Sequence, residues 1–404
     1  MQNVESELEK GFEILRGCCG VPGALDYFFL QAKKYFCFEG QDCGPEVLIL
    51  GSTFPEELLM AYHIRPHWVV GGGLAISECA DSLVPRDADA VSRSALGYIK
   101  TYQEKTGKKP PVIIPIAGDS QRKLSYLLEE DGWTVYPLYI MPGASSASLS
   151  FSIAGQLDEI MEKLSLRWLL PGTARGIRRA VQKTSRAKDA FFELCYDPAI
   201  RLNGMVKHFL NLTWFYAEDL EEWTERITIL KDSLREMQLP SAREGPGVLV
   251  IGSPILFPNF KVPQLLDACG LEVVNCCSWV TGKTCPQEWT GNVSILNRQE
   301  ALQQLAESSF NHESSGAFVR NRDLYDQALR QLDGGKVRGV ILHILKGQIE
   351  YDFEADRLEQ LFTHRNIPVL RLETDYHDND IEQLRIRLEA FSELLKQSIY
   401  EILL

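Results

Sequence analysis

The sequence predicts an α/β protein made of two similar, doubly wound parallel-sheet halves. Two distant stretches, 47–70 and 248–274, follow the same plan. Each has an apolar run, a Gly-Ser turn, a proline-led amphipathic segment and a second apolar run, which is the pattern of a βαβ unit. A further pair of units at 112–138 and 339–372 repeats this plan and supports an internal duplication.

The turns that follow the first strand of each unit are expected to open helices. Thr53 and Glu56 have the spacing of a capping box, and Asp119 and Ser120 are expected to be N-caps. Free N–H groups at such turns also suit an anion, and the strand ends of a parallel sheet form a crevice where ligands bind. The candidate substrate- or anion-binding residues are Ser52, Thr53, Gly118, Asp119, Ser120, Arg122, Ser253, Lys261 and Lys346.

Four regions follow from the distribution of these patterns. We expect a helical lead-in at 1–44, a first α/β half at 45–149, a helical insert at 150–240 and a second α/β half at 241–404. The second half should end in a long helix from about Asp380 to Leu403, because its apolar residues recur at the three-to-four spacing of a packed helix face.

Composition limits the class of protein. A chain of 404 residues is too long for one ordinary core. The 45% hydrophobic and 24% charged content is that of a soluble globular protein, and the net charge of -13 argues against general nucleic-acid binding. No apolar run reaches the ~18 residues of a membrane helix, and the acidic N-terminus does not resemble a signal peptide. We therefore expect a cytoplasmic protein.

The ten cysteines include no Cys-x-x-Cys pair. Disulfides are not expected in a cytoplasmic chain. The densest group is Cys276, Cys277 and Cys285, but adjacent cysteines on a strand point to opposite faces. Buried, inert thiols are favoured there over a metal site. No P-loop or Ser-His-Asp arrangement occurs, and the glycine run at 71–73 lacks dinucleotide-binding spacing.

Two charged stretches lie in the predicted insert. They are either solvated helix faces that pair with each other, or a surface for phosphate or a partner, since Arg matches phosphate oxygens bidentately. The basic stretch is Arg175, Arg178, Arg179, Lys183, Arg186 and Lys188; the acidic one is Glu218, Asp219, Glu221, Glu222 and Glu225.

Several motifs in the chain resemble those of a known family. The most specific are Glu-Thr-Asp-Tyr at 373–376 and Gln-Leu-Arg-x-Arg at 383–387. Further motifs lie at 83–86, 94–98, 119–124, 258–263, 281–283 and 345–354. With these motifs, residues 45–400 resemble the D-component of the 2-hydroxyacyl-CoA dehydratase and benzoyl-CoA reductase family.

The resemblance implies radical chemistry on acyl-CoA thioesters in anaerobic metabolism. Subunits of this family pair as heterodimers and hold [4Fe–4S] clusters between their halves, and an ATP-hydrolysing activator delivers electrons. No side chain performs one-electron chemistry at such potentials, so a cluster must supply it. The resemblance therefore implies a paired subunit, either a sister chain or a second copy.

The chain departs from the family where the cluster-binding cysteines are expected. Asp89, Gly118 and Gln348 stand at the three positions. Oxygen ligands are poor substitutes, because the irons of such clusters prefer thiolate. Cys79 lies ten residues before Asp89 and would reach the site only if the loop were rebuilt. We therefore expect no metal or cofactor in this chain, and a [4Fe–4S] cluster in a sister subunit.

Three functional interpretations remain open from sequence. The first is a cluster-free dehydratase or reductase subunit that supports an acyl-CoA site together with a cluster-bearing sister. The second is a non-catalytic binding or regulatory protein of the same fold. The third is an iron–sulfur enzyme with unusual ligands such as Cys79, Asp89 and Gln348. His343, at a predicted strand end, is expected to be a packed neutral histidine rather than a general base.

Overall fold

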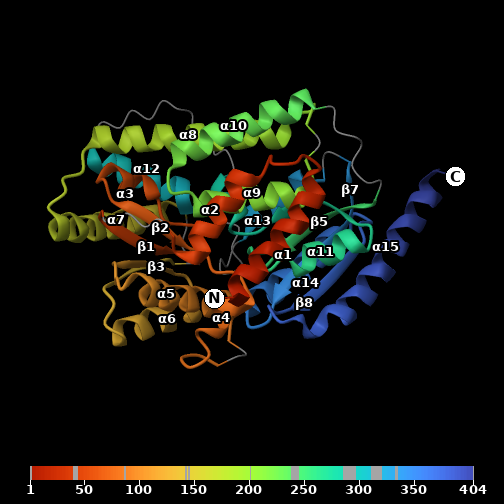
Figure 1. The fold of residues 1–404 in the computed structure, drawn as a ribbon, viewed down its shortest axis with the longest axis horizontal. Coiled ribbons are helices and arrows are strands. Elements are labelled where there is room, and N and C mark those ends of the chain that lie inside the picture. Colours follow the sequence, from red (N-terminus) through yellow and green to blue (C-terminus); the bar gives the residue numbers. More distant parts are fainter. Residues whose placement is uncertain are drawn as a thin grey trace.

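The structure, a computed structural model, is of the α/β class, with two parallel sheets and helices packed around them (Figure 1). No helix among the residues it describes is long and apolar enough to cross a bilayer. The described residues are 2–39, 44–85, 88–141, 143, 146–200, 202–237, 245–284, 297–310, 321–332 and 335–403.

The secondary structure follows the predicted plan. The N-terminal region forms α1 (Gln2–Cys19) and α2 (Asp26–Cys37). The first half contains β1 (Glu46–Leu50), α3 (Glu56–Ala61), β2 (Arg65–Val69), α4 (Leu74–Glu78), α5 (Ala90–Thr106), β3 (Val112–Ile116), α6 (Asp119–Glu130) and β4 (Val135–Tyr139). Next come α7 (Ser146–Trp168), α8 (Ala174–Tyr196), α9 (Gly204–Tyr216) and α10 (Leu220–Glu236).

The second half has the same strand plan with more helices. It contains β5 (Gly247–Gly252), α11 (Lys261–Ala268), β6 (Glu272–Cys277), the 3-10 helix η1 (Thr281–Thr284), α12 (Arg298–Phe310), α13 (Arg322–Arg330), β7 (Val337–Leu345), α14 (Ile349–Thr363), β8 (Val369–Thr374), the 3-10 helix η2 (Asp378–Asp380) and α15 (Ile381–Leu403). The sequence patterns predicted α15 but not α12 or α13.

The two sheets have the same topology. Their strand orders are β2-β1-β3-β4 and β6-β5-β7-β8, and every neighbouring pair is parallel. The inner strands β1, β3 and β5 are buried along their whole length. This burial explains their continuous apolar sequences, because helices or other elements cover both faces of a parallel sheet. The predicted pair of doubly wound halves is confirmed.

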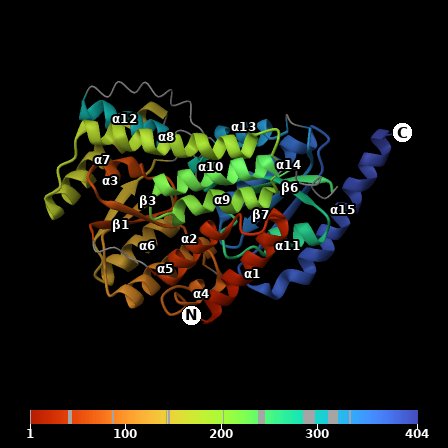
Figure 2. The same cartoon turned by 45° about the horizontal axis from the view of Figure 1, so that its top comes forward.

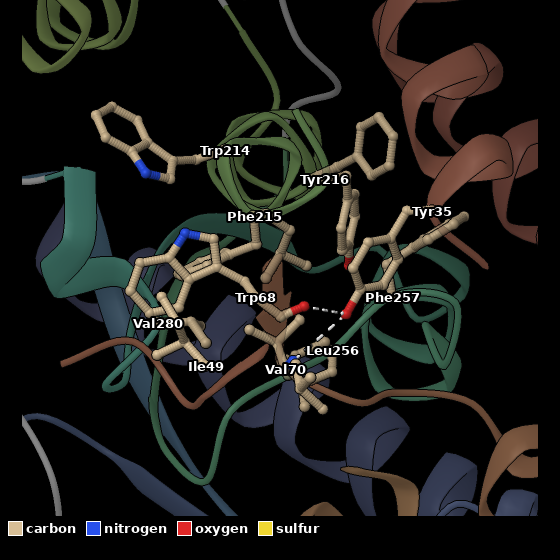
Figure 3. Close-up of a cluster of buried hydrophobic side chains, with 14 of the residues drawn as sticks. Tyr35, Ile49, Trp68, Val70, Trp214, Phe215, Tyr216, Leu256, Phe257 and Val280 are labelled. Carbon is tan, nitrogen blue, oxygen red and sulfur yellow. Dashed lines mark hydrogen bonds between the residues drawn. The ribbon is translucent and has the colours of Figure 1, made fainter. Parts of the chain in front are cut away.

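Helix α9 lies between the halves and is buried on nearly every side. It packs against β2 of the first half, β6 of the second half and α2. Helices α8 and α10 pack together on the outside of this arrangement (Figure 2). In Figure 3, aromatic side chains of α9 point between residues of both halves: Ile49, Trp68 and Val70 from the first, and Leu256, Phe257 and Val280 from the second.

One hydrophobic core therefore crosses the predicted domain boundaries. It contains Phe12 of α1, Ile49 of β1, Phe209 of α9 and Phe257 of the second half. The rings of Phe209 and Phe257 are 5.1 Å apart, and those of Phe12 and Phe257 are 5.4 Å apart. The boundaries at 44, 149 and 240 remain predictions, because this core packs the regions together rather than separating them.

The glycine run at 71–73 has a packing role. All three glycines have positive φ. A Cβ on Gly72 would lie 2.3 Å from the carbonyl oxygen of Phe257, in the other half. Only glycine allows the two backbones to approach this closely.

The predicted capping box at Thr53 and Glu56 is wrong. The N-cap of α3 is Pro55, which makes no side-chain cap hydrogen bond. The side chain of Glu56 is instead directed into the protein interior, where Trp68 and Trp214 donate to it. The sequence spacing of a capping box does not show whether the glutamate faces its own helix or a tertiary partner.

A buried carboxylate anchors the start of β1. Glu46 accepts hydrogen bonds from Arg65 (2.5 Å), from Nδ1 of His67 (2.9 Å) and from the hydroxyl of Tyr102 (2.6 Å). Burial alone would raise the pKa of Glu46. The hydrogen bond from His67, the charges of His67 and Arg65 and the Tyr102 hydroxyl outweigh it and lower this pKa to about 2.

This network predicts a pH-dependent effect of Glu46→Gln. The folded-state pKa lies below the usual 4.5, so the ionised carboxylate stabilises the fold above pH 4.5, and this contribution is lost as the pH falls toward 2. We expect the variant to lose about 2–3 kcal/mol of unfolding free energy at pH 7, and about half of that at pH 3. Urea unfolding at both pH values measures this. The exposed Glu359→Gln is the control, and an equal loss at both pH values would contradict the assignment.

Candidate functional site

Asp89, the first of the positions that lack the family's cysteine, caps a helix. It immediately precedes α5 and is 8% exposed. Its carboxylate accepts hydrogen bonds from the backbone N–H groups of Val91 (3.2 Å) and Ser92 (3.1 Å), and from the Ser92 hydroxyl (2.5 Å). Because a side-chain acceptor stabilises an N-cap, the oxygen at position 89 has a local structural role that sequence reasoning missed.

Gln348, the second such position, contacts Asp89 from the other half. Gln348 follows β7 and is buried. Burial raises the pKa of the Asp89 carboxyl, and the nearby Gln348 side chain is among the groups that oppose this rise. The preceding Gly347 has φ +89°, and a Cβ there would lie 2.8 Å from the backbone nitrogen of Asp89. The backbones of the two halves are therefore in contact at this point.

Gly118, the third position, follows β3 in the first half. It is the N-cap of α6 and makes no side-chain cap. Cys79, the alternative ligand considered from sequence, is the C-cap of α4 and lies 3.6 Å from the Cβ that would be added at Gly97. Gly97 is eight residues beyond Asp89 in α5, or about 12 Å along the helix. The structure therefore brings Asp89 into contact with the segment that contains Gln348, and it places Cys79 farther along α5.

These residues do not fit a thiolate-held cluster. Hydrogen bonds within the protein already occupy the Asp89 carboxylate, Gly118 has no side chain, and an amide is a poor ligand for iron in such clusters. In the part of the chain that the structure describes, no group of three or more His, Cys, Asp or Glu could hold a metal ion. In the predicted cysteine group, burial raises the pKa of Cys276 to about 12, and Cys285 lies outside the described residues.

Lys261, a candidate for binding an anion, is engaged inside the protein. It is 6% exposed. Its ammonium donates to the carbonyl oxygens of Asp375 (2.8 Å) and His377 (2.6 Å) and to the carboxylate of Asp380 (2.7 Å). All three ammonium hydrogens are used, so this arrangement leaves none for an external anion.

Ser253 is also engaged internally. It is 2% exposed; its N–H donates to the carbonyl of His343 (2.8 Å), and its hydroxyl accepts from the N–H of Leu345 (2.9 Å). The expectation that the Gly-Ser turn here opens a helix is wrong, because α11 begins only at Lys261. Instead, the residues of this turn form hydrogen bonds with β7, the strand next to β5.

The corresponding turn in the first half is similar. Ser52 and Thr53 are both buried, and the Ser52 hydroxyl donates to the carbonyl of Trp279 in the second half (3.2 Å). Helix α3 begins at Glu56. The Ser52 hydroxyl therefore connects the two halves.

Four other candidates are exposed. Asp119 and Ser120 are the first residues of α6 rather than its caps, so the expectation that they are N-caps is wrong. Asp119 pairs with Arg122 at 3.2 Å, and Lys346 pairs with Asp375 at 2.9 Å. Both pairs are exposed to solvent. Among the candidate residues, Arg122 and Lys346 are therefore the cations that a dissolved ligand can reach.

Two buried histidines lie near the strand ends of the second half. Burial lowers the pKa of both His343 and His208 to about 4. Nδ1 of His343 contacts the carbonyl of Ser253 at 2.8 Å, and Nε2 of His208 contacts the carbonyl of Ile255 at 2.7 Å. Each contact suits a neutral ring that donates one N–H, which agrees with the packed role expected for His343.

A buried ion pair between the halves was not expected from sequence. Glu56 accepts hydrogen bonds from the indoles of Trp68 and Trp214, each at 2.9 Å, and its carboxylate lies 3.2 Å from the ammonium of Lys283. Lys283 also lies 4.3 Å from the centre of the Trp68 ring. Every residue here is known from the sequence, but no local pattern shows that positions 56, 214 and 283 meet.

The charged stretches of the insert are partly paired with each other. Lys183 of α8 lies 3.1 Å from Glu221 of α10, and Glu218 pairs with Lys34 of α2 at 3.0 Å. Arg175, Arg179 and Arg186 are exposed. The pairing interpretation therefore applies to part of the stretch, and an exposed row of arginines remains on α8.

The buried ion pair predicts a large effect of Lys283→Met. Removing the ammonium leaves the Glu56 carboxylate buried without its counterion, which should cost about 3–5 kcal/mol of unfolding free energy. Lys346→Met removes an exposed pair and should cost at most about 1 kcal/mol. The double variant Glu56→Gln/Lys283→Met should be more stable than Lys283→Met alone. Chemical denaturation measures all three, and equal losses for the two lysine variants would contradict the assignment.

Comparison with known proteins places this geometry in a family. The model of the 2-hydroxyglutaryl-CoA dehydratase D-component family matches residues 52–395, which begin just after β1 and include the rest of the first half, the insert and most of the second half. A search of curated proteins found no match. The matched region contains Asp89, Gly118 and Gln348, as well as the strands β2 to β8, and it extends over most of the 404 residues. The chain therefore belongs to the 2-hydroxyglutaryl-CoA dehydratase D-component family.

Proposed function

We propose that this chain is a cluster-free subunit of a 2-hydroxyacyl-CoA dehydratase-type complex, and that it supports an acyl-CoA site together with a cluster-bearing sister subunit. Family membership supports the assignment to such a complex. The observation that carries the finer proposal is the replacement of all three expected thiolates by Asp89, Gly118 and Gln348. A chain without these thiolates cannot bind the redox centre in the usual way.

The division of roles follows from the chemistry. One-electron reduction of a thioester requires a cofactor of low potential, which protein side chains do not provide. The sister would therefore hold the [4Fe–4S] cluster and receive electrons from an ATP-hydrolysing activator. This chain would contribute its fold, a subunit interface and accessible cations.

The accessible cations indicate which residues would meet a CoA thioester. The buried Lys261 is occupied by three oxygens, whereas Arg122 and Lys346 have exposed side chains. Exposed arginines are also present on α8. Because CoA carries several phosphates, guanidinium groups are suitable partners for it.

An alternative is a non-catalytic binding or regulatory protein of the same fold. The engagement of Ser52, Ser253 and Lys261 by the protein itself favours it, because fewer polar groups than expected are free at the strand ends. The two functions differ in whether the chain, alone or with its sister, binds CoA thioesters.

The cluster-free proposal predicts the iron content. Anaerobically purified chain should contain no stoichiometric iron or sulfide and lack the broad absorption near 400 nm (roughly) of thiolate-held clusters. Co-expression with a cluster-bearing sister should yield a pair with about four irons. Stoichiometric iron and sulfide in this chain alone would refute the proposal, and failure to form any pair, with a sister or with itself, would remove the subunit role.

The acyl-CoA proposal predicts binding that weakens with salt. Phosphate pairing at an exposed site is screened beyond ~8 Å at physiological ionic strength, so affinity for a 2-hydroxyacyl-CoA should fall between low and physiological salt. Arg122→Gln should weaken binding by roughly threefold to tenfold, the scale of one exposed charge-assisted contact.

Arg385→Gln is the matched control, because Arg385 also forms an exposed i,i+3 pair with an acid. Isothermal calorimetry on the chain alone and on the pair measures the affinities. Absence of binding in both samples would leave the non-catalytic alternative, and equal effects of the two arginine variants would exclude Arg122 from the site.

A further inference from the structure

Two segments from opposite halves meet where the family resemblance places a metal centre. One segment begins α5, and the other includes the ends of β7 and β8 and the start of α14. We call this contact the seam; it consists of Asp89 and Ala90 from the first half and Leu345, Gly347, Gln348 and Tyr376 from the second.

The apolar part of the seam is a small separate core. Ala90, Leu345 and Tyr376 are each at most 5% exposed and form a cluster distinct from the two larger cores. It contains residues of both halves, so separating the halves at this point would expose it to water. Burial of apolar surface therefore favours the closed seam.

The polar part of the seam is a single buried contact. The Asp89 carboxylate accepts from the N–H groups of α5, and the Gln348 side chain is close enough to favour its ionised form. The amide oxygen of Gln348, Oε1, is buried and has no hydrogen-bond partner among the described residues.

The backbone at the seam is close enough to require glycine. Gly347 has φ +89°, and a Cβ would lie 2.8 Å from the nitrogen and 2.9 Å from the Cα of Asp89. Real Cβ atoms do not make such contacts with backbone. The two segments are therefore held at van der Waals distance at positions 89 and 347.

We infer that the seam is a structural joint, which holds the halves together through protein contacts alone at the place where the family binds its cluster. The three positions that would ligate a cluster do not fit one: the Asp89 carboxylate is occupied by Val91 and Ser92, Gln348 is a buried amide beside it, and Gly118 has no side chain. This inference does not rest on the proposed function, because it requires neither a partner nor a substrate.

The competing explanation is that Asp89 only caps α5. A cap is local to the first half, so a change at Gln348 should not affect it. A joint makes the cap and the amide interdependent, although they belong to different halves. A double-mutant cycle isolates such dependence.

The experiment measures unfolding of the purified chain for Asp89→Ala, Gln348→Ala and the double variant. A joint should give a coupling of at least about threefold in the unfolding equilibrium constant, the range found for residues in contact. Amide hydrogen exchange should report it independently: Gln348→Ala should accelerate exchange at Val91 and Ser92, which lie across the seam. Additive effects together with unchanged exchange at these amides would overturn the inference.

Asp219→Ala is the matched control for loss of a cap. Asp219 is the exposed N-cap of α10 and accepts from Glu221 N–H within its own helix. Its loss should change the unfolding constant by roughly fivefold and show no coupling with Gln348→Ala. If Asp89→Ala does not fold, Asp89→Asn takes its place in the cycle, because Asn retains capping ability.

Gly347→Ala tests the backbone contact separately. Gly270→Ala is its matched control, since Gly270 has φ +70° and a Cβ there would meet nothing within 4 Å. Both variants introduce strain from positive φ, but only Gly347→Ala should also displace Asp89. We expect Gly347→Ala to be the more destabilised by at least about tenfold in the unfolding constant and to accelerate exchange at Val91. Equal effects would show that the halves are not in contact there.

Discussion

Because α9 is buried between the two halves, polar groups in the interior need hydrogen-bond partners. The Glu56 carboxylate is the acceptor and counterion for several of them. Its carboxylate accepts from Trp68 of β2 and Trp214 of α9, and its charge is balanced by Lys283 after β6. A buried charge is tolerated only when it is both paired and hydrogen-bonded. The two halves and α9 each contribute a residue to the environment of the Glu56 carboxylate, and their packing therefore depends on this one group.

The polar residues that follow the strands are also used for contacts within the protein. In α/β proteins these positions commonly bind ligands, but here Ser52, Ser253 and Lys261 contact the protein itself. Asp89 and Gln348 do so as well. The family fold is present, while side chains at its expected reaction centre make interior contacts. Because a fold alone does not establish an activity, the function of this chain has to be argued from these side chains.

Sequence reasoning was most successful where structure is local and periodic. The paired βαβ units and α15 are confirmed, because apolar spacing reports burial directly. The capping box at Thr53 and Glu56 and the helix-opening turn at Ser253 are wrong, because tertiary contacts override local signals there. The Glu56–Lys283 pair and the contact of Asp89 with Gln348 join residues that are distant in sequence, and no spacing rule encodes them.

The separation of Glu56 and Lys283 along the chain has a consequence for biosynthesis. A ribosome adds about 5–20 residues per second, so the lysine is made roughly 10 to 45 s after the glutamate. During that interval the Glu56 carboxylate of the nascent first half has no Lys283 to balance its charge. Helix α9 also lacks the part of the second half against which it packs. The N-terminal half therefore cannot reach its final packing ahead of the C-terminal half, although it contains a complete sheet. Productive folding must wait until translation has passed η1.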